Sequence, residues 1–359
     1  MTEPGAGFAM HDAGSLSCAP PTGTSRLAAA LSFLTIGACC AVLMQLDVPL
    51  LRFFRSLDLS SVERLGNLGE KIGNGATLAA VSLCLLAVGW LAGRKQWMQV
   101  GTKSLLAHGC VGLVVNGLKH LIARPRPRLT HSGGWQWWPS FESGLDSFPS
   151  GHASATFAVA TVLARHWPRT AWIGYSLATW VAMSRVWRGS HFATDVVAGM
   201  VAGVVVGTVF AGPLRQWRTA FMQAMVRVTP IAVLITSALW LILRRVDHVW
   251  MDRLLSIGGI CFIAAGLLLR FRMDRAPEAV WSPVAYRAGM ILIGLGLACT
   301  TGSLVLVGLA GLAASAWWLQ AAALHGASSR VPSLRTLHVF GIALAALLIL
   351  QLKGIVPIQ

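Results

Sequence analysis

The segment PSGHASATFAVATVLAR, residues 149–165, joins a polar tetrapeptide to an uncharged apolar run that ends at a basic residue. The run lacks Gly and Pro after residue 151 and predicts one helix of 16 or so residues. At about 1.5 Å per residue, such a helix is short for a hydrocarbon core of about 30 Å. We therefore expect the polar start of this segment to be sunk below a membrane surface.

The same kind of apolar run recurs on both sides of this segment. The 359 residues are 55% hydrophobic and 12% charged, with a mean hydropathy of +0.65. Soluble domains usually carry about 25% charged residues, so this composition excludes a disordered chain and an ordinary soluble enzyme. The sequence predicts an all-α polytopic membrane protein with room for about eleven helices of about 20 residues each.

The expected spans divide into a group of six followed by a group of five. The first group comprises residues 27–46, 76–93, 99–122, 150–165, 170–184 and 191–212. The second comprises residues 228–243, 254–269, 288–300, 303–324 and 337–352. A short interfacial helix is expected at 50–54 and an amphipathic connector at 213–227. Gly199, Gly203 and Gly207 recur at four-residue spacing in the sixth span and predict close contact with another helix.

Basic residues indicate the orientation of these spans. The net charge of +16 comes mostly from Lys and Arg between apolar runs, which is typical of membrane topology signals and not of nucleic-acid binding. With the N-terminus inside, inner loops hold most of these cations. Ten spans would place Arg330 and Arg335 outside, so eleven spans are preferred. Residues 119–148 and 185–191 then share the outer face, and their cations require a functional explanation.

Three of these outer cations, Lys119, Arg126 and Arg185, point to an anion. Few carboxylates are near them in sequence, so an external phosphate is their expected partner. Ser150 and Gly151 begin a helix, whose free backbone N–H groups suit phosphate. Further cations at Arg124, Arg128 and Arg188 can contact a second phosphate or a lipid headgroup, or only anchor the chain at the interface. Glu142 and Asp146 can pair with loop arginines and are assigned no chemistry.

Two histidines supply candidate acid–base and nucleophilic groups. His191 and Asp195 are four residues apart, so a carboxylate hydrogen bond to one imidazole nitrogen can leave the other nitrogen as a nucleophile. His152 comes from a different helix and can act as the opposing acid or base. The 31 residues between His152 and Ser184 form one helix inward and one helix back, so both motifs return to the same face.

The complete pattern K-x6-RP, PSGH, SR-x5-H-x3-D, in this order, resembles the type 2 phosphatidic acid phosphatase superfamily, which is related to vanadium haloperoxidases. The resemblance covers roughly residues 26–212. It implies a six-helix core with a site near the extracytoplasmic face of the cell (inner) membrane, working without a metal or other cofactor. It also implies a role for each matching residue: His191 as the nucleophile that forms a phosphohistidine, Asp195 as the group that orients it, His152 as the acid for the leaving oxygen, Lys119, Arg126 and Arg185 as phosphate ligands, and Ser150 and Gly151 as further donors.

These observations predict three regions: a disordered leader at 1–25, a phosphatase-like membrane domain at 26–212, and a C-terminal helical region of unknown role at 213–359. The expected activity is hydrolysis of a lipid phosphate or diphosphate, such as undecaprenyl diphosphate, phosphatidate, phosphatidylglycerophosphate or a lipid A phosphate. Two alternatives stay open: a lipid-to-lipid phosphotransferase that uses the same histidine, and a non-enzymatic lipid transporter or scaffold. The expected partners are the substrate and membrane lipids, and the sequence does not specify an oligomeric state.

Overall fold

Helices form all of the regular structure in the described part of the chain. The computed structural model describes residues 23–56, 63–130, 138–243, 249–275, 283–301 and 303–323. Within these ranges the chain forms α-helices and short 3-10 turns and no strand, which confirms the all-α prediction. Most of the predicted leader and the whole of the predicted span at 337–352 lie outside the described residues.

The described residues of the N-terminal half form seven α-helices. They are α1 (Gly23–Ser56), α2 (Glu63–Ile72), α3 (Gly75–Leu91), α4 (Lys95–Ile122), α5 (Gly151–His166), α6 (Ala171–Trp187) and α7 (Ala193–Ala211). The separate interfacial helix expected at 50–54 is wrong, because α1 continues through Pro49 and buries Leu50 and Leu51 against protein. Helix α1 also includes residues 23–25, which the sequence assigned to the leader. Helix α2 was not predicted.

The C-terminal half contains four described helices. They are α8 (Trp217–Leu243), α9 (Val249–Arg275), α10 (Pro283–Thr300) and α11 (Leu304–Ala323). The predicted break between residues 300 and 303 separates α10 from α11 as expected. The connector expected at 213–227 is mostly wrong, since α8 starts at Trp217 and runs on through Pro230. Its polar residues are good helix formers, so polarity there marks exposure and not the end of a helix.

Several helices have the length and composition of membrane spans. Four qualify among the described residues, or five if α2 and α3, which bend by 52° at their junction, are one broken span. Helix α5 has 16 residues and a length of about 24 Å, short of a full span as expected. The structure therefore supports a membrane protein with several spans, while the division into six and five spans stays a prediction.

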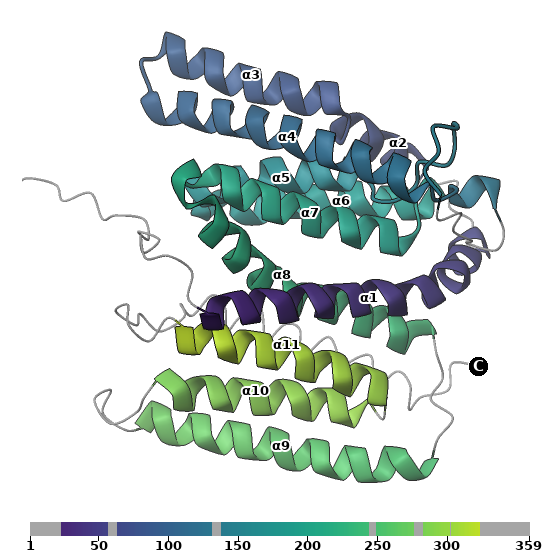
Figure 1. Ribbon diagram of the computed structural model, residues 1–359, viewed down its shortest axis with the longest axis vertical. Coiled ribbons are helices and arrows are strands. Elements are labelled where there is room, and N and C mark those ends of the chain that lie inside the picture. The colour runs from purple at the N-terminus through teal and green to yellow at the C-terminus, as the bar shows by residue number, and fades with distance from the viewer. Residues whose placement is uncertain are drawn as a thin grey trace, which may run out of the picture.

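Helices α5, α6 and α7 occupy the centre of the N-terminal half (Figure 1). Helices α3 and α4 pack together on one side of them, and α1, α8 and then α11, α10 and α9 follow on the other (Figure 1). The predicted glycine face of α7 packs on α5: a Cβ at Gly199 would lie 2.6 Å from the Ser150 carbonyl oxygen. A Cβ at Gly207 would lie 2.5 Å from the Ala158 carbonyl oxygen. This close contact fixes the start of α5 against the start of α7.

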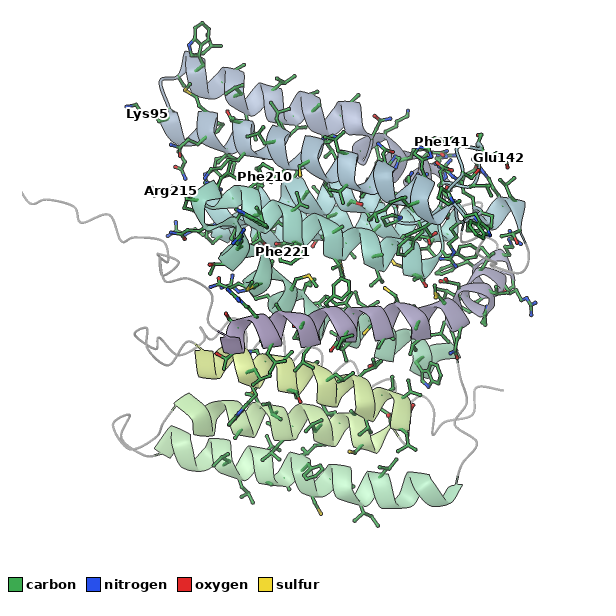
Figure 2. All side chains as sticks on the ribbon, viewed as in Figure 1. Lys95, Phe141, Glu142, Phe210, Arg215 and Phe221 are labelled. Carbon is green, nitrogen blue, oxygen red and sulfur yellow. The ribbon has the colours of Figure 1, made fainter. Side chains whose placement is uncertain are left out.

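The alternating direction of the helices brings particular ends together. The C-terminal ends of α4 and α6 lie at the same end of the molecule as the N-terminal ends of α5 and α7 (Figure 1). Lys95 and Arg215 lie at the opposite end (Figure 2). The fold thus separates the predicted site from the loops that the sequence assigns to the inner face.

Candidate active site

The three predicted polar segments meet at one end of α4 to α7. The Ser150 backbone N–H donates to the Asp195 carbonyl oxygen at 2.9 Å, and the Ser147 N–H donates to the Arg124 carbonyl oxygen at 2.9 Å. His191 Nδ1 lies 2.8 Å from the Ser147 carbonyl oxygen. Backbone groups of all three segments are therefore joined into one unit.

His191 is buried in the loop that precedes α7. Its Nδ1 contact with the Ser147 carbonyl requires a proton on Nδ1, which leaves Nε2 unprotonated in the neutral ring. Asp195 Oδ2 lies 3.8 Å from Nδ1, too far for a hydrogen bond but close enough to stabilise an imidazolium. The expected direct hydrogen bond from His191 to Asp195 is thus replaced by one from His191 Nδ1 to the Ser147 carbonyl oxygen. The reason is that α7 begins only at Ala193, so His191 and Asp195 do not share a regular helical face.

Asp195 is held by groups from three directions. Its Oδ2 accepts from Ser147 Oγ at 2.6 Å and from the Phe192 N–H at 2.8 Å. Its Oδ1 accepts from Arg124 Nη1 at 2.5 Å. The carboxylate is fully buried, so these bonds fix its position beside His191.

Arg124 is an internal ion-pair partner, with 1% of its surface exposed. Its Nη2 donates to Asp47 Oδ2 at 2.7 Å, and its guanidinium lies 4.1 Å from the centre of the Phe192 ring. Asp47, on α1, also accepts from the Thr194 N–H at 3.0 Å and from Thr194 Oγ1 at 2.7 Å. None of the roles considered for Arg124 from the sequence, which were contact with a second phosphate, contact with a headgroup and interface anchoring, is therefore correct. The segment that carries it folds inward instead.

Lys119 and Arg126 share one carboxylate. Arg126 Nε donates to Asp146 Oδ1 at 2.7 Å, and its Nη2 donates to Asp146 Oδ2 at 2.5 Å. Lys119 Nζ lies 3.5 Å from Asp146 Oδ2. Burial raises the pKa of this loop carboxyl, but bonds from Arg126 and the charges of Arg126 and Lys119 prevail and lower its pKa to about 2.

Arg185 faces a second carboxylate, from α2. Glu70 Oε2 lies 3.7 Å from Arg185 Nη1 and forms a close ion pair with Arg188. The expectation that few carboxylates lie near these cations is therefore wrong. The pairing of Asp146 with a loop arginine was expected and is confirmed, whereas Glu70 was not expected, because it comes from the unpredicted helix α2. Four cations still face two carboxylates here among the described residues.

Several buried polar atoms at this end have no hydrogen-bond partner within the described residues. They include Ser150 Oγ, His152 Nε2 and Arg185 Nε. His152 interacts electrostatically with both Arg185 and His191. Gly151 adjoins Lys119, whose Nζ would lie 4.0 Å from a Cβ added there. Buried donors without partners are costly, so their convergence is typical of a site that binds a polar ligand.

Helix α2 covers the site from the side of α6. A Cβ added at Gly69 would lie 2.7 Å from Ser184 Oγ, and one at Gly73 would lie 3.0 Å from His152 Cδ2. The two glycines therefore let α2 approach α6 and His152 closely. This contact is what brings Glu70 to Arg185.

Sequence reasoning missed three residues of this network: Asp47, Glu70 and Ser147. Asp47 carried a usable signal, because a carboxylate beside an apolar span usually has a partner in the protein interior. Ser147 and Glu70 carried none, since their contacts depend on how a loop and a short helix fold back.

The sequence profile described as the PAP2 superfamily matches residues 101–218, a range that contains all eight predicted site residues. The chain is 30% identical over 185 residues to the lipid A 1-phosphatase of Rhizobium etli, covering 48% of this chain and 78% of that protein. It is 28% identical over 138 residues to the undecaprenyl-diphosphatase BcrC of Bacillus subtilis, covering 37% of this chain and 67% of that protein. It is 30% identical over 121 residues to the decaprenylphosphoryl-5-phosphoribose phosphatase of Mycobacterium tuberculosis, covering 32% of this chain and 60% of that protein.

No solved structure matches the chain. The relatives are phosphatases of lipid phosphates, and they support a lipid phosphatase activity in a membrane protein. The sequence profile, the 78% coverage of a relative at 30% identity and the motif residues gathered at one end of the helices agree. On this evidence the chain belongs to the PAP2 superfamily.

Proposed function

We propose that this protein hydrolyses a lipid phosphate or diphosphate through a phosphohistidine formed on His191. The observation that carries the proposal is the tautomer of the buried His191, whose ring interacts electrostatically with Lys119 and Arg126 and whose Nε2 is left unprotonated. The hydrogen bond from Nδ1 to the Ser147 carbonyl sets the tautomer that a nucleophilic Nε2 requires. Asp195, 3.8 Å from Nδ1, stabilises the charge that develops on the ring.

Phosphate binding is the role proposed for Lys119, Arg126 and Arg185. Arginine forks match phosphate oxygens, and lysine adds a point charge. Ser150 Oγ and the first backbone N–H groups of α5 complete the set, and Ser150 has no side-chain bond that caps this helix. These groups neutralise the charge on the equatorial oxygens as the phosphoryl group transfers.

Transfer proceeds in two steps in this proposal. His191 Nε2 attacks phosphorus as the bond to the lipid oxygen breaks, and His152 donates a proton to that oxygen. His152 then accepts a proton from water, whose oxygen attacks phosphorus as the bond to His191 breaks. The products are the dephosphorylated lipid and inorganic phosphate, and no metal takes part.

The proposed substrate is a lipid because the site lies at the end of apolar helices. Lipid A 1-phosphate is the first candidate, since the Rhizobium etli relative has the greatest coverage of those reported. Undecaprenyl diphosphate is the second. Cationic inner loops favour a site on the extracytoplasmic face, because Lys95 and Arg215 lie at the opposite end (Figure 2).

A phosphate-release screen with purified protein tests the proposal. The panel contains lipid A, undecaprenyl diphosphate, phosphatidate and phosphatidylglycerophosphate, with EDTA present throughout. We expect release of inorganic phosphate from at least one lipid, and a loss of at least about 10³-fold in His191→Ala, which lacks the nucleophile. His166→Ala is the control, since His166 ends α5 at the opposite end.

Three outcomes would overturn parts of this proposal. Wild-type activity in His191→Ala would exclude a phosphohistidine on His191. Appearance of all released phosphoryl groups on an acceptor lipid would identify a phosphotransferase. Loss of activity in EDTA, restored by a divalent metal, would refute the metal-free mechanism.

A further inference from the structure

Asp146 occupies a position that the proposed function gives to a phosphate. It bonds both Nε and Nη2 of Arg126 with its two oxygens and lies 3.5 Å from Lys119 Nζ. This is the bidentate fork that arginine also offers to phosphate. A phosphate that accepts hydrogen bonds from Nε and Nη2 of Arg126 must displace Asp146. A phosphate that binds beside Asp146 is repelled by the carboxylate charge.

The side chain of Asp146 has room to leave while its backbone stays fixed. The next residue, Ser147, is fully buried and holds Asp195 and His191. The Asp146 side chain itself is 30% exposed. A rotation about its side-chain bonds can therefore free Arg126 without disturbing the nucleophile.

Resting on the proposed function, we propose that Asp146 is a built-in competitor that selects terminal phosphate groups over phosphodiesters. A terminal phosphate carries about −1.5 to −2 charges at pH 7, whereas a phosphodiester carries one. The carboxylate also carries one charge, so a terminal phosphate outcompetes it and a phosphodiester does not. A lipid phosphatase is surrounded by phosphodiester headgroups, and this contact keeps them out of the site.

The charge needed for this selection is present throughout the physiological pH range. With a pKa lowered to about 2, Asp146 stays ionised at any pH at which the protein works. A change in pH from 5 to 8 therefore does not open the site. Only an anion with a greater charge does so.

Asp146→Asn tests the proposal, with Glu142→Gln as the matched control. Glu142 lies in the same loop at the same end of the molecule, and its side chain is exposed (Figure 2). The assay measures phosphate release from short-chain phosphatidate in detergent micelles, with short-chain phosphatidylglycerol as the phosphodiester inhibitor. We expect Asp146→Asn to lower the inhibition constant of phosphatidylglycerol by about tenfold, because the repelling charge is gone. Wild type and Glu142→Gln should be equally resistant.

Asp146→Glu separates charge from loop structure, since it keeps the carboxylate and should keep the resistance. Unchanged inhibition by phosphatidylglycerol in Asp146→Asn would overturn the proposal, as would equal sensitivity in Asp146→Glu. Thermal stabilisation of the same proteins by phosphatidylglycerol measures binding without turnover. If wild type released no phosphate from any lipid, the proposed function would fail, and this binding difference would still decide the role of Asp146. If Asp146→Asn did not fold, Asp146→Ser would take its place in both assays.

Discussion

The end of α4 to α7 that holds the candidate active site and the interface between α9 and α10 are held together by different kinds of contact. At the site, buried ion pairs and hydrogen bonds join Arg124, Asp47 and Asp195. Between α9 and α10, glycines allow one backbone to touch the other: a Cβ at Gly259 would lie 2.5 Å from the Gly296 carbonyl oxygen.

Buried hydrogen bonds and glycine contacts determine different features of the structure. A buried hydrogen bond fixes the direction of a donor or an acceptor, which catalysis requires to within a fraction of an ångström. A glycine contact fixes only how closely two helices approach. Changes at the site should therefore alter the rate more than the stability, and changes between α9 and α10 should do the opposite.

Of the Discussion's variants that test whether the site controls the rate, His152→Ala should lower kcat the most. Loss of a general acid should lower kcat by about 10²–10⁴-fold for a lipid alcohol, which needs a proton to leave. The loss should be much smaller with p-nitrophenyl phosphate, whose leaving group departs as an anion. The measurement is kcat for both substrates.

His120→Ala is the control for this variant. His120 lies at the same end, where its Nδ1 is 3.1 Å from the Ser140 carbonyl oxygen, and it takes no part in the site network. Equal losses with both substrates in His152→Ala would contradict a role as the acid.

Asp47→Asn tests whether the buried ion pairs position the nucleophile. Asp47 contacts neither His191 nor the proposed phosphate ligands, so KM should change little. Weaker support of Arg124, and through it of Asp195, should lower kcat by about tenfold, a cost of about 1.4 kcal/mol in the transition state. The measurement is the division of the effect between kcat and KM, per folded molecule.

Asp47→Glu keeps the charge and should restore part of kcat. A rise in KM at constant kcat, or a loss of folded protein without a change in kcat, would show that Asp47 has only a structural role.

Much of the site could be predicted because motif residues sit at known ends of helices. Apolar runs of predictable direction placed Lys119, His152, Arg185 and His191 at one end. The pairing of Asp146 with a loop arginine was predicted, because both residues lie in the same segment between two spans. The ion pair of Asp47 with Arg124 was missed and that of Glu70 could not be predicted, because these partners come from segments distant in sequence. Those carboxylates change the description of the site from bare cations to partly paired ones.

The fold shows a similar division between what hydropathy reports and what it does not. Each of the first ten expected spans overlaps an observed helix, because an apolar run buries its backbone polar groups most cheaply as a helix. Helix ends were missed at α1 and α8, where the backbone hydrogen bonding continues past the apolar run. Helix α2 was missed because it is short, polar and amphipathic, and hydropathy alone does not distinguish it from a loop.

Gly259→Ala tests whether a change between α9 and α10 alters stability and leaves the rate unchanged. It should have the smallest effect on activity. The added methyl group meets the Gly296 backbone and should lower the free energy of unfolding by about 1–3 kcal/mol. Gly258→Ala is the matched control: a Cβ there has nothing within 4 Å, and alanine favours a helix over glycine. Thermal unfolding in detergent and phosphate release per folded molecule are measured for both variants. We expect kcat to stay within about twofold in each, because a helix–helix distance so far from the site does not redirect its donors.

A lower kcat in Gly259→Ala at unchanged stability would reverse this conclusion. It would mean that α9 and α10 are coupled to the site, and the contacts of α11 with α1, which carries Asp47, supply the path to examine next.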